Sequence, residues 1–155
     1  MNLTKNFKLE EFTKSQTASR KGIDNTPDDK VIKNLKVVSK NICQRVRDSF
    51  NRPVYINSGY RSEELNTAIG GSTNSQHIIG QAVDMEIPGV TNYDQALWIR
   101  DNLDFDQLIL EAYTPGVLNS GWVHCSYKNP EKNRKEVLTA TFENGTVTYS
   151  RGLNK

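Results

Sequence analysis

Three side chains in the sequence have the chemistry of metal ligands. Histidine occurs only twice, so any imidazole chemistry must use His77 and His124. Asp84 follows His77 by seven residues, where a polar loop gives way to a predicted strand, and Gly80 between them lets the backbone turn. Imidazole nitrogen and carboxylate oxygen both bind zinc, and a His/Asp/His set leaves one coordination position open, as in catalytic sites. Because a histidine on a strand is more often a hydrogen-bonded structural residue, the spacing alone leaves both interpretations open.

Two predicted strands carry these ligands. Alternation over residues 81–87 predicts a half-buried strand that turns Asp84 and Glu86 away from the core. Alternation over residues 121–127 predicts a second strand, with His124 on the face opposite the more apolar positions. The sequence therefore predicts that at least two of the three ligands project from a sheet.

The remaining elements follow from hydrophobic periodicity. Apolar residues at spacings of four, three, four and four predict a long helix over residues 28–49, with Thr26 as its cap and Pro27 in its first turn. Further patterns predict strands at 54–56 and 105–112, a short helix at 62–69, a helix at 93–103 that uses Leu97, Trp98 and Leu103, and a hairpin that turns at Asn144-Gly145. This order predicts an α+β fold with a small, mostly antiparallel sheet and helices packed on one side.

Length and composition exclude several classes of protein. With 155 residues we expect a single domain, 1–155, in which residues 1–28 form an N-terminal arm packed on the body. A net charge of +2 is too small to predict nucleic-acid binding, and no apolar run is long enough to enter a membrane. The N-terminus has no apolar signal-peptide region, so we expect synthesis in the cytoplasm.

Cys43 and Cys125 are expected to be two separate buried thiols. A monomer is the expected state, and the Lys/Arg-rich segment 128–135 is expected to be a solvated loop.

Several motifs match a known group of proteins, and together they extend over nearly the whole chain. They are Ser58-Gly-Tyr-Arg-Ser62, the S-x-H-x-x-G-x-A-x-D run at 75–84, Trp122-Val-His124, Phe7-Lys-Leu-Glu-Glu-Phe12 and Gly22-Ile-Asp-Asn-Thr-Pro27. With these motifs the chain resembles the zinc D-alanyl-D-alanine carboxypeptidase-like peptidases of bacterial and phage peptidoglycan metabolism. That group also includes lysostaphin-type enzymes and the hedgehog signalling domain. The resemblance implies this fold and one zinc ion per chain, with His77, Asp84 and His124 as its ligands.

The resemblance also implies a residue that contacts substrate. Members of the group place an arginine of the S-G-Y-R loop against the substrate, which assigns this role to Arg61. Its guanidinium fork suits a carboxylate or a developing oxyanion. Ser75 is assigned either a hydrogen bond to the substrate backbone or a cap on its own loop.

The general base is less clearly marked. Close relatives carry an acidic residue three positions before the last ligand, or a histidine two positions before it, but here Gly121 and Trp122 occupy these positions. Glu111 is the favoured substitute, because a carboxylate at the end of an apolar strand needs water, metal or a partner. Glu86 is the competing candidate, since it shares a strand face with Asp84. Trp122 itself is expected to be a cleft or core aromatic.

These features predict a zinc metallopeptidase that hydrolyses amide bonds in peptidoglycan stem or cross-link peptides. We expect a phage or prophage endolysin or virion-associated hydrolase, which reaches the wall through a holin, by lysis or on a virion. D-Ala-D-Ala, D,D-cross-link and L-Ala-D-Glu bonds are all compatible with the sequence. The alternative is a non-catalytic, zinc-stabilised binding or structural module, such as a phage tail component. It stays open because Gly121 and Trp122 occupy the two positions before His124 where relatives carry an acidic residue or a histidine.

Overall fold

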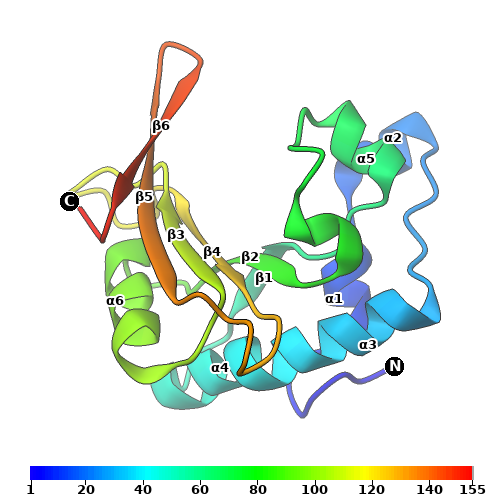
Figure 1. Cartoon of the computed structure of the whole chain (residues 1–155), viewed down its shortest axis with the longest axis horizontal. Coiled ribbons are helices and arrows are strands. Elements are labelled where there is room, and N and C mark those ends of the chain that lie inside the picture. Colours follow the sequence, from blue (N-terminus) through cyan, green and yellow to red (C-terminus); the bar gives the residue numbers. More distant parts are fainter. Residues whose placement is uncertain (155) are drawn as a thin grey trace.

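The computed structural model describes residues 1–154, and a six-stranded sheet organises them (Figure 1). The strands are β1 (Tyr55–Ser58), β2 (Ala82–Glu86), β3 (Gln107–Glu111), β4 (Trp122–Ser126), β5 (Glu136–Glu143) and β6 (Thr146–Arg151), in the spatial order β1-β2-β4-β3-β5-β6. Strands β3 and β5 pair in parallel, and every other neighbouring pair in this described part of the chain is antiparallel. The predicted α+β fold with a mostly antiparallel sheet is therefore confirmed.

A long helix packs along one face of this sheet. It consists of α3 (Asp29–Val38), the π-helical segment η1 (Ser39–Cys43) and α4 (Gln44–Phe50), close to the predicted range. The predicted cap is wrong by two residues, because the Asp28 side chain, rather than that of Thr26, accepts the capping hydrogen bond from the backbone of Val31. The backbone N–H of Thr26 donates instead to Asp24, so a turn precedes the helix.

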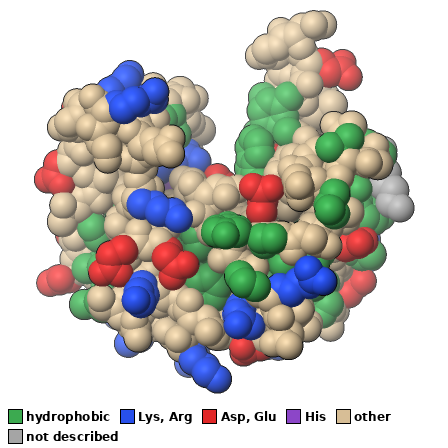
Figure 2. Space-filling model, turned by 180° about the vertical axis from the view of Figure 1, so that it is seen from behind, with side chains coloured by type: hydrophobic (Ala, Val, Ile, Leu, Met, Phe, Trp, Pro, Cys, Tyr) green, Lys and Arg blue, Asp and Glu red, His purple; other side chains and the backbone are tan. Residues whose placement is uncertain are grey.

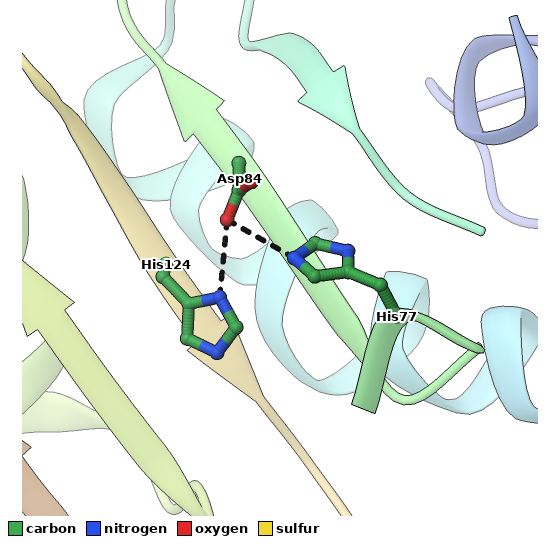
Figure 3. A group of neighbouring side chains, drawn as sticks. All are labelled: His77, Asp84 and His124. Carbon is green, nitrogen blue, oxygen red and sulfur yellow. Dashed lines mark hydrogen bonds and ion pairs between the residues drawn. The ribbon is translucent and has the colours of Figure 1, made fainter. Parts of the chain in front are cut away.

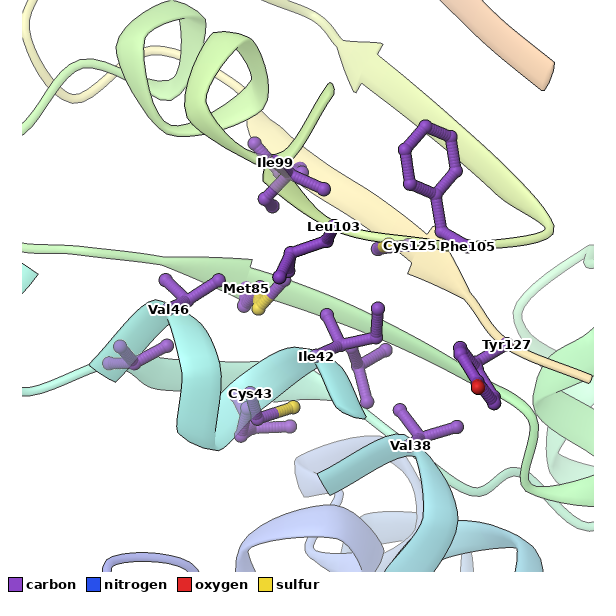
Figure 4. Close-up of a cluster of buried hydrophobic side chains, with 14 of the residues drawn as sticks. Val38, Ile42, Cys43, Val46, Met85, Ile99, Leu103, Phe105, Cys125 and Tyr127 are labelled. Carbon is purple, nitrogen blue, oxygen red and sulfur yellow. The ribbon is translucent and has the colours of Figure 1, made fainter. Parts of the chain in front are cut away.

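The core lies between the sheet and its helices (Figure 4). The strand residues that face the helices are register neighbours and fully buried: Val83, Met85, Leu108, Leu110, Val123 and Cys125. Val38, Ile42 and Val46 of the long helix join the same cluster, as do Ala96 and Ile99 of α6 (Asn92–Asn102). Both helices thus cover one sheet face, as predicted. Strand β2 is nevertheless buried on both faces rather than half-buried, because cleft residues cover its other side.

The N-terminal arm contains α1 (Leu9–Thr13) and α2 (Gln16–Lys21) and packs on the S-G-Y-R loop. Phe7 and Phe12 are buried in the core cluster. The carbonyl oxygen of Phe12 accepts a hydrogen bond of 2.7 Å from the backbone N–H of Tyr60. A Cβ atom at Gly59 would lie 2.7 Å from that oxygen, so only glycine permits the close approach of arm and loop.

The two cysteines are unpaired and buried, as predicted. Cys43 lies in η1 and Cys125 in β4, and burial raises the pKa of both thiols. No helix within residues 1–154 is long and apolar enough to cross a membrane.

Candidate active site

A cleft of about 780 Å³ opens on the sheet face that is turned away from the core. One side is formed by residues 69–79, which follow α5 (Glu63–Ala68) and include the 3-10 helix η2 (Gln76–Ile79). The other side is formed by the β5–β6 hairpin, and Figure 2 shows the hollow between the two projecting parts. The predicted ligands, general base and substrate contacts all line this cleft, together with the expected cleft aromatic: Arg61, Ser75, His77, Asp84, Glu111, Trp122 and His124.

The three predicted ligands meet around one carboxylate oxygen (Figure 3). Asp84 stands directly opposite His124 in the β2–β4 ladder, so strand pairing brings both side chains to the same face. His77 reaches them from η2. The Oδ1 atom of Asp84 lies 3.0 Å from Nδ1 of His124 and 3.3 Å from Nε2 of His77.

Local backbone structure fixes the orientation of His77. The Ser75 side chain caps η2 by accepting a hydrogen bond of 3.2 Å from the His77 backbone N–H, and Gly80 ends this helix with a φ of 75°. The Nδ1 atom of His77 lies 2.7 Å from the carbonyl oxygen of Gly59. Because a carbonyl oxygen only accepts, Nδ1 carries the proton and Nε2 presents its lone pair to a metal. The turn expected at Gly80 is confirmed and Ser75 forms the cap, while its contact with substrate stays a prediction.

The donor set and its spacing fit a zinc ion. Nitrogen and oxygen donors about 2.0–2.1 Å from a tetrahedral zinc lie roughly 3.3 Å from one another. The two separations from Asp84, 3.0 and 3.3 Å, match this value, and all three donor atoms lie within 4.8 Å of one another. Two imidazoles and one carboxylate also leave a coordination position for water or substrate, so the set is of the catalytic type.

The groups around Asp84 keep its carboxyl group ionised, as a metal ligand requires. Burial raises the pKa of this carboxyl group, but the two imidazoles lower it by more, so the pKa lies well below its ordinary range. The second carboxylate oxygen, Oδ2, lies 3.4 Å from Nη2 of Arg61. Arg61 is itself held by Ser58, whose Oγ accepts from Nε at 3.0 Å, and by Asn66, whose Oδ1 accepts from Nη1 at 3.2 Å. Arg61 therefore orients a ligand as well as lining the cleft, a role that the sequence alone did not indicate.

Glu111 supplies a second carboxylate to the same cleft. It stands opposite Trp122 in the β3–β4 ladder, and Nε1 of Trp122 donates a hydrogen bond of 3.0 Å to its Oε2. Burial raises the pKa of Glu111, and the negative charge of Asp84 adds to this effect. Glu86 is not part of the cleft lining, because it lies at the end of β2 and accepts a hydrogen bond of 2.7 Å from Asn57.

A buried ion pair that the sequence reasoning missed supports the cleft. The carboxylate of Asp106 is fully buried and accepts hydrogen bonds from Nε and Nη2 of Arg134 at 3.0 and 2.9 Å. It also accepts one of 3.1 Å from Nε2 of Gln76, the residue before His77. Segment 128–135 is thus a loop, as predicted, but Arg134 ties it to the body. An acidic residue at the start of an apolar strand was the available signal.

Comparison with known families agrees with the fold and the site. Residues 5–126, which include all three candidate ligands, match the model of the family described as peptidase M15. The chain therefore belongs to the M15 family of zinc D-Ala-D-Ala carboxypeptidase-like peptidases, and it is a zinc metallopeptidase. No curated protein matches the chain. The β5–β6 hairpin lies outside the matched residues.

Proposed function

We propose that this zinc metallopeptidase cleaves amide bonds in the stem or cross-link peptides of peptidoglycan, with Glu111 as its general base and acid. The family and the sequence motifs shared with D-Ala-D-Ala carboxypeptidase-like enzymes support the substrate class. One observation carries the catalytic assignment: Glu111 lines the same cleft as the three ligands and is held there by Trp122.

Each polar residue of the cleft has a role in this proposal. His77, Asp84 and His124 would hold a zinc ion, which would act as a Lewis acid toward the scissile carbonyl group and toward water. Glu111 accepts a proton from the attacking water, and its raised pKa favours keeping that proton until the leaving amine accepts it. Arg61 donates a hydrogen bond to the carbonyl oxygen as negative charge develops there.

Ser75 has a supporting role in substrate binding. Its oxygen already accepts the His77 backbone N–H, so its hydroxyl proton is available for a carbonyl oxygen of the substrate backbone. The hydroxyl group would then position the peptide without taking part in proton transfer.

The non-catalytic alternative depended on the missing acid or base beside His124. Glu111 removes the need for such a residue, because a carboxylate from the neighbouring strand lines the same cleft. We propose further that the enzyme is of phage or prophage type and reaches the wall after holin-mediated release, lysis or delivery on a virion. The motifs at Phe7–Phe12 and Gly22–Pro27, which are similar to phage and prophage members, support this origin.

Digestion of purified peptidoglycan fragments, followed by mass spectrometry, tests the activity and identifies the bond. We expect cleavage by the wild type and a rate at least about 100-fold lower for Glu111→Gln, since a general base contributes about 10²–10⁴-fold. Glu86→Gln is the matched control and should cleave at close to the wild-type rate. Elemental analysis should give about one zinc per chain for all three proteins and a loss of zinc in His77→Ala. Intact fragments after incubation with zinc-loaded wild type would favour the binding module instead.

A further inference from the structure

The β5–β6 hairpin presents an apolar surface to the cleft. Phe142 and Val147 are a cross-strand pair, and Tyr149 follows on the same face. Their side chains are 45%, 38% and 56% exposed, and all three line the cleft; we call them the aromatic wall. The other face of the hairpin tip carries the cross-strand pair Thr141 and Thr148. Apolar groups are thus concentrated on the one face that looks into the cleft, which is how binding surfaces differ from scattered exposed residues.

Strand register connects the aromatic wall to the proposed catalytic carboxylate. Trp122, Glu111, Ala140 and Tyr149 are successive neighbours across β4, β3, β5 and β6. Ala140 is small, so little side-chain bulk separates Tyr149 from Glu111. Burial raises the pKa of Tyr149, and the charge of Glu111 contributes to the same shift. The Phe142 ring also lies 5.9 Å from the ring of Trp122, measured between centroids.

The wall is uncharged in a cleft that is otherwise strongly charged. The cations that line the cleft, Arg61, Lys128 and Arg134, all come from other elements. An anionic group placed against the wall would lose hydration beside the carboxylate of Glu111, whereas an apolar group would gain free energy from burial. The wall therefore fits an uncharged, apolar part of a ligand that lies beside Glu111.

We propose that the aromatic wall is the subsite for an apolar side chain of the peptide substrate next to the bond that is cut, and that it disfavours negatively charged side chains there. The inference rests on the proposed function, because the alanine methyl groups of stem peptides are the apolar groups that the wall would accept. The hairpin lies beyond the residues that match the M15 family model, so the family match does not itself assign this subsite.

Binding to the metal-free protein tests the wall separately from catalysis. The sequence has two tryptophans, so a Trp98→Phe background leaves Trp122, beside the wall, as the only fluorescent indole. The probe is the stem pentapeptide L-alanyl-γ-D-glutamyl-L-lysyl-D-alanyl-D-alanine. We expect Phe142→Ala to raise its Kd about tenfold, equivalent to about 1.4 kcal/mol, because the variant loses apolar contact area. Thr141→Ala, on the opposite face of the hairpin, should change the Kd less than about twofold. Val147→Ala is a milder second variant of the wall.

Three analogues, each with one alanine replaced by aspartate of the same handedness, identify the group that contacts the wall. One of them should bind the background protein about tenfold more weakly than the parent peptide, and this ratio should shrink when Phe142→Ala is added. The proposal is overturned if the parent peptide is bound and cut but Phe142→Ala behaves like Thr141→Ala, or if no aspartate penalty depends on Phe142. A protein that neither binds the parent peptide nor cuts purified peptidoglycan fragments would refute the proposed function itself, and the assigned occupant of the wall with it.

Discussion

Arg61 shows how much a single side chain contributes to the site. Its three guanidinium nitrogens each have a different acceptor, namely Ser58, Asn66 and the ligand Asp84. A lysine has one nitrogen, so it cannot keep this planar arrangement of contacts. The side chain is only 15% exposed, and its remaining hydrogens are those available to a substrate.

Arg61→Lys should therefore reduce catalysis while leaving metal binding largely intact. We expect kcat to fall about 100-fold, as for other donors to a developing oxyanion. Zinc content should stay near one per chain, because the three ligands are unchanged. Arg20→Lys, on the exposed part of α2, is the control. A kcat within a factor of two of wild type would contradict the proposed role of Arg61.

The hydrogen bond from Trp122 makes the ionisation of Glu111 testable. A general base must be deprotonated, so activity should be lost as the pH falls through the raised pKa of Glu111. The Trp122 N–H stabilises the ionised carboxylate and so lowers this pKa. In Trp122→Phe the acidic limb of the kcat/KM profile should therefore move to higher pH, by an amount on the order of one unit. An unmoved limb, or an equal movement in Trp98→Phe, would show that another group controls this limb.

At the scale of elements, the sequence predicted which strands exist but not how they are ordered. Alternation correctly placed Asp84 and His124 on the sides of their strands that face away from the core. It contained no information that β4 would lie between β2 and β3, although β3 precedes β4 in the chain. That order puts His124 opposite Asp84. The resemblance to a known family implied that both residues bind the same metal ion, but it did not predict this strand order. Long-range strand pairing depends on the packing of the whole core, which local periodicity does not record.

Helix α6 shows a second limit of sequence patterns. Leu97 and Trp98 were expected to be its core residues, but both are only partly buried. Its buried face carries Asn92 and Gln95 in addition to apolar residues. The Asn92 amide donates hydrogen bonds to the carbonyl groups of Ser120 and Gly121, directly before β4. A hydropathy pattern treats such amides as exposed, because their backbone partners are distant in the sequence.

The Asp106 ion pair should make stability depend on pH. Burial raises the pKa of Asp106, but its hydrogen bonds to Arg134 lower it by more, so the pKa is lower in the folded protein. Its stabilising effect should thus be complete above the ordinary aspartate pKa of about 3.9, and it should be lost as the pH falls through the lower folded value.

Asp106→Asn should consequently reduce the free energy of unfolding by about 2 kcal/mol at pH 7, the range for hydrogen bonds to charged groups. The difference from wild type should narrow below about pH 4. Urea unfolding of chelator-treated protein measures both quantities without the added effect of zinc. Asp104→Asn, at an exposed position, is the control, and a difference that does not change between pH 7 and pH 3 would contradict this prediction.

At the scale of the whole molecule, backbone hydrogen bonds link the N-terminal arm to the metal site. Phe12 is fully buried, and its backbone holds the loop whose Gly59 carbonyl orients His77. The metal site therefore depends on a segment more than sixty residues away in the chain. This link follows from close backbone contact, which no side-chain motif would reveal.

Phe12→Ala should weaken both the fold and the metal site. We expect the free energy of unfolding to fall by about 3–4 kcal/mol, as for other buried phenylalanines. The Kd for zinc should rise about tenfold, as when partners of metal-binding histidines are disturbed. Urea unfolding and competition with a coloured chelator measure the two effects. Leu9→Ala, at a partly buried position of the same arm, should change zinc affinity little, and equal effects of the two variants would refute the connection.

The two buried thiols have a consequence for how the protein responds to oxidation. Because Cys43 and Cys125 are both enclosed in the core and hard to ionise, residues 1–154 of the folded protein offer no reactive thiol to oxidants or to other thiols. The enzyme should tolerate an aerated medium without forming mixed disulfides. Iodoacetamide would alkylate the two cysteines only when the helices and the sheet move apart and expose the core. The rate of cysteine labelling would therefore report how often the native core opens.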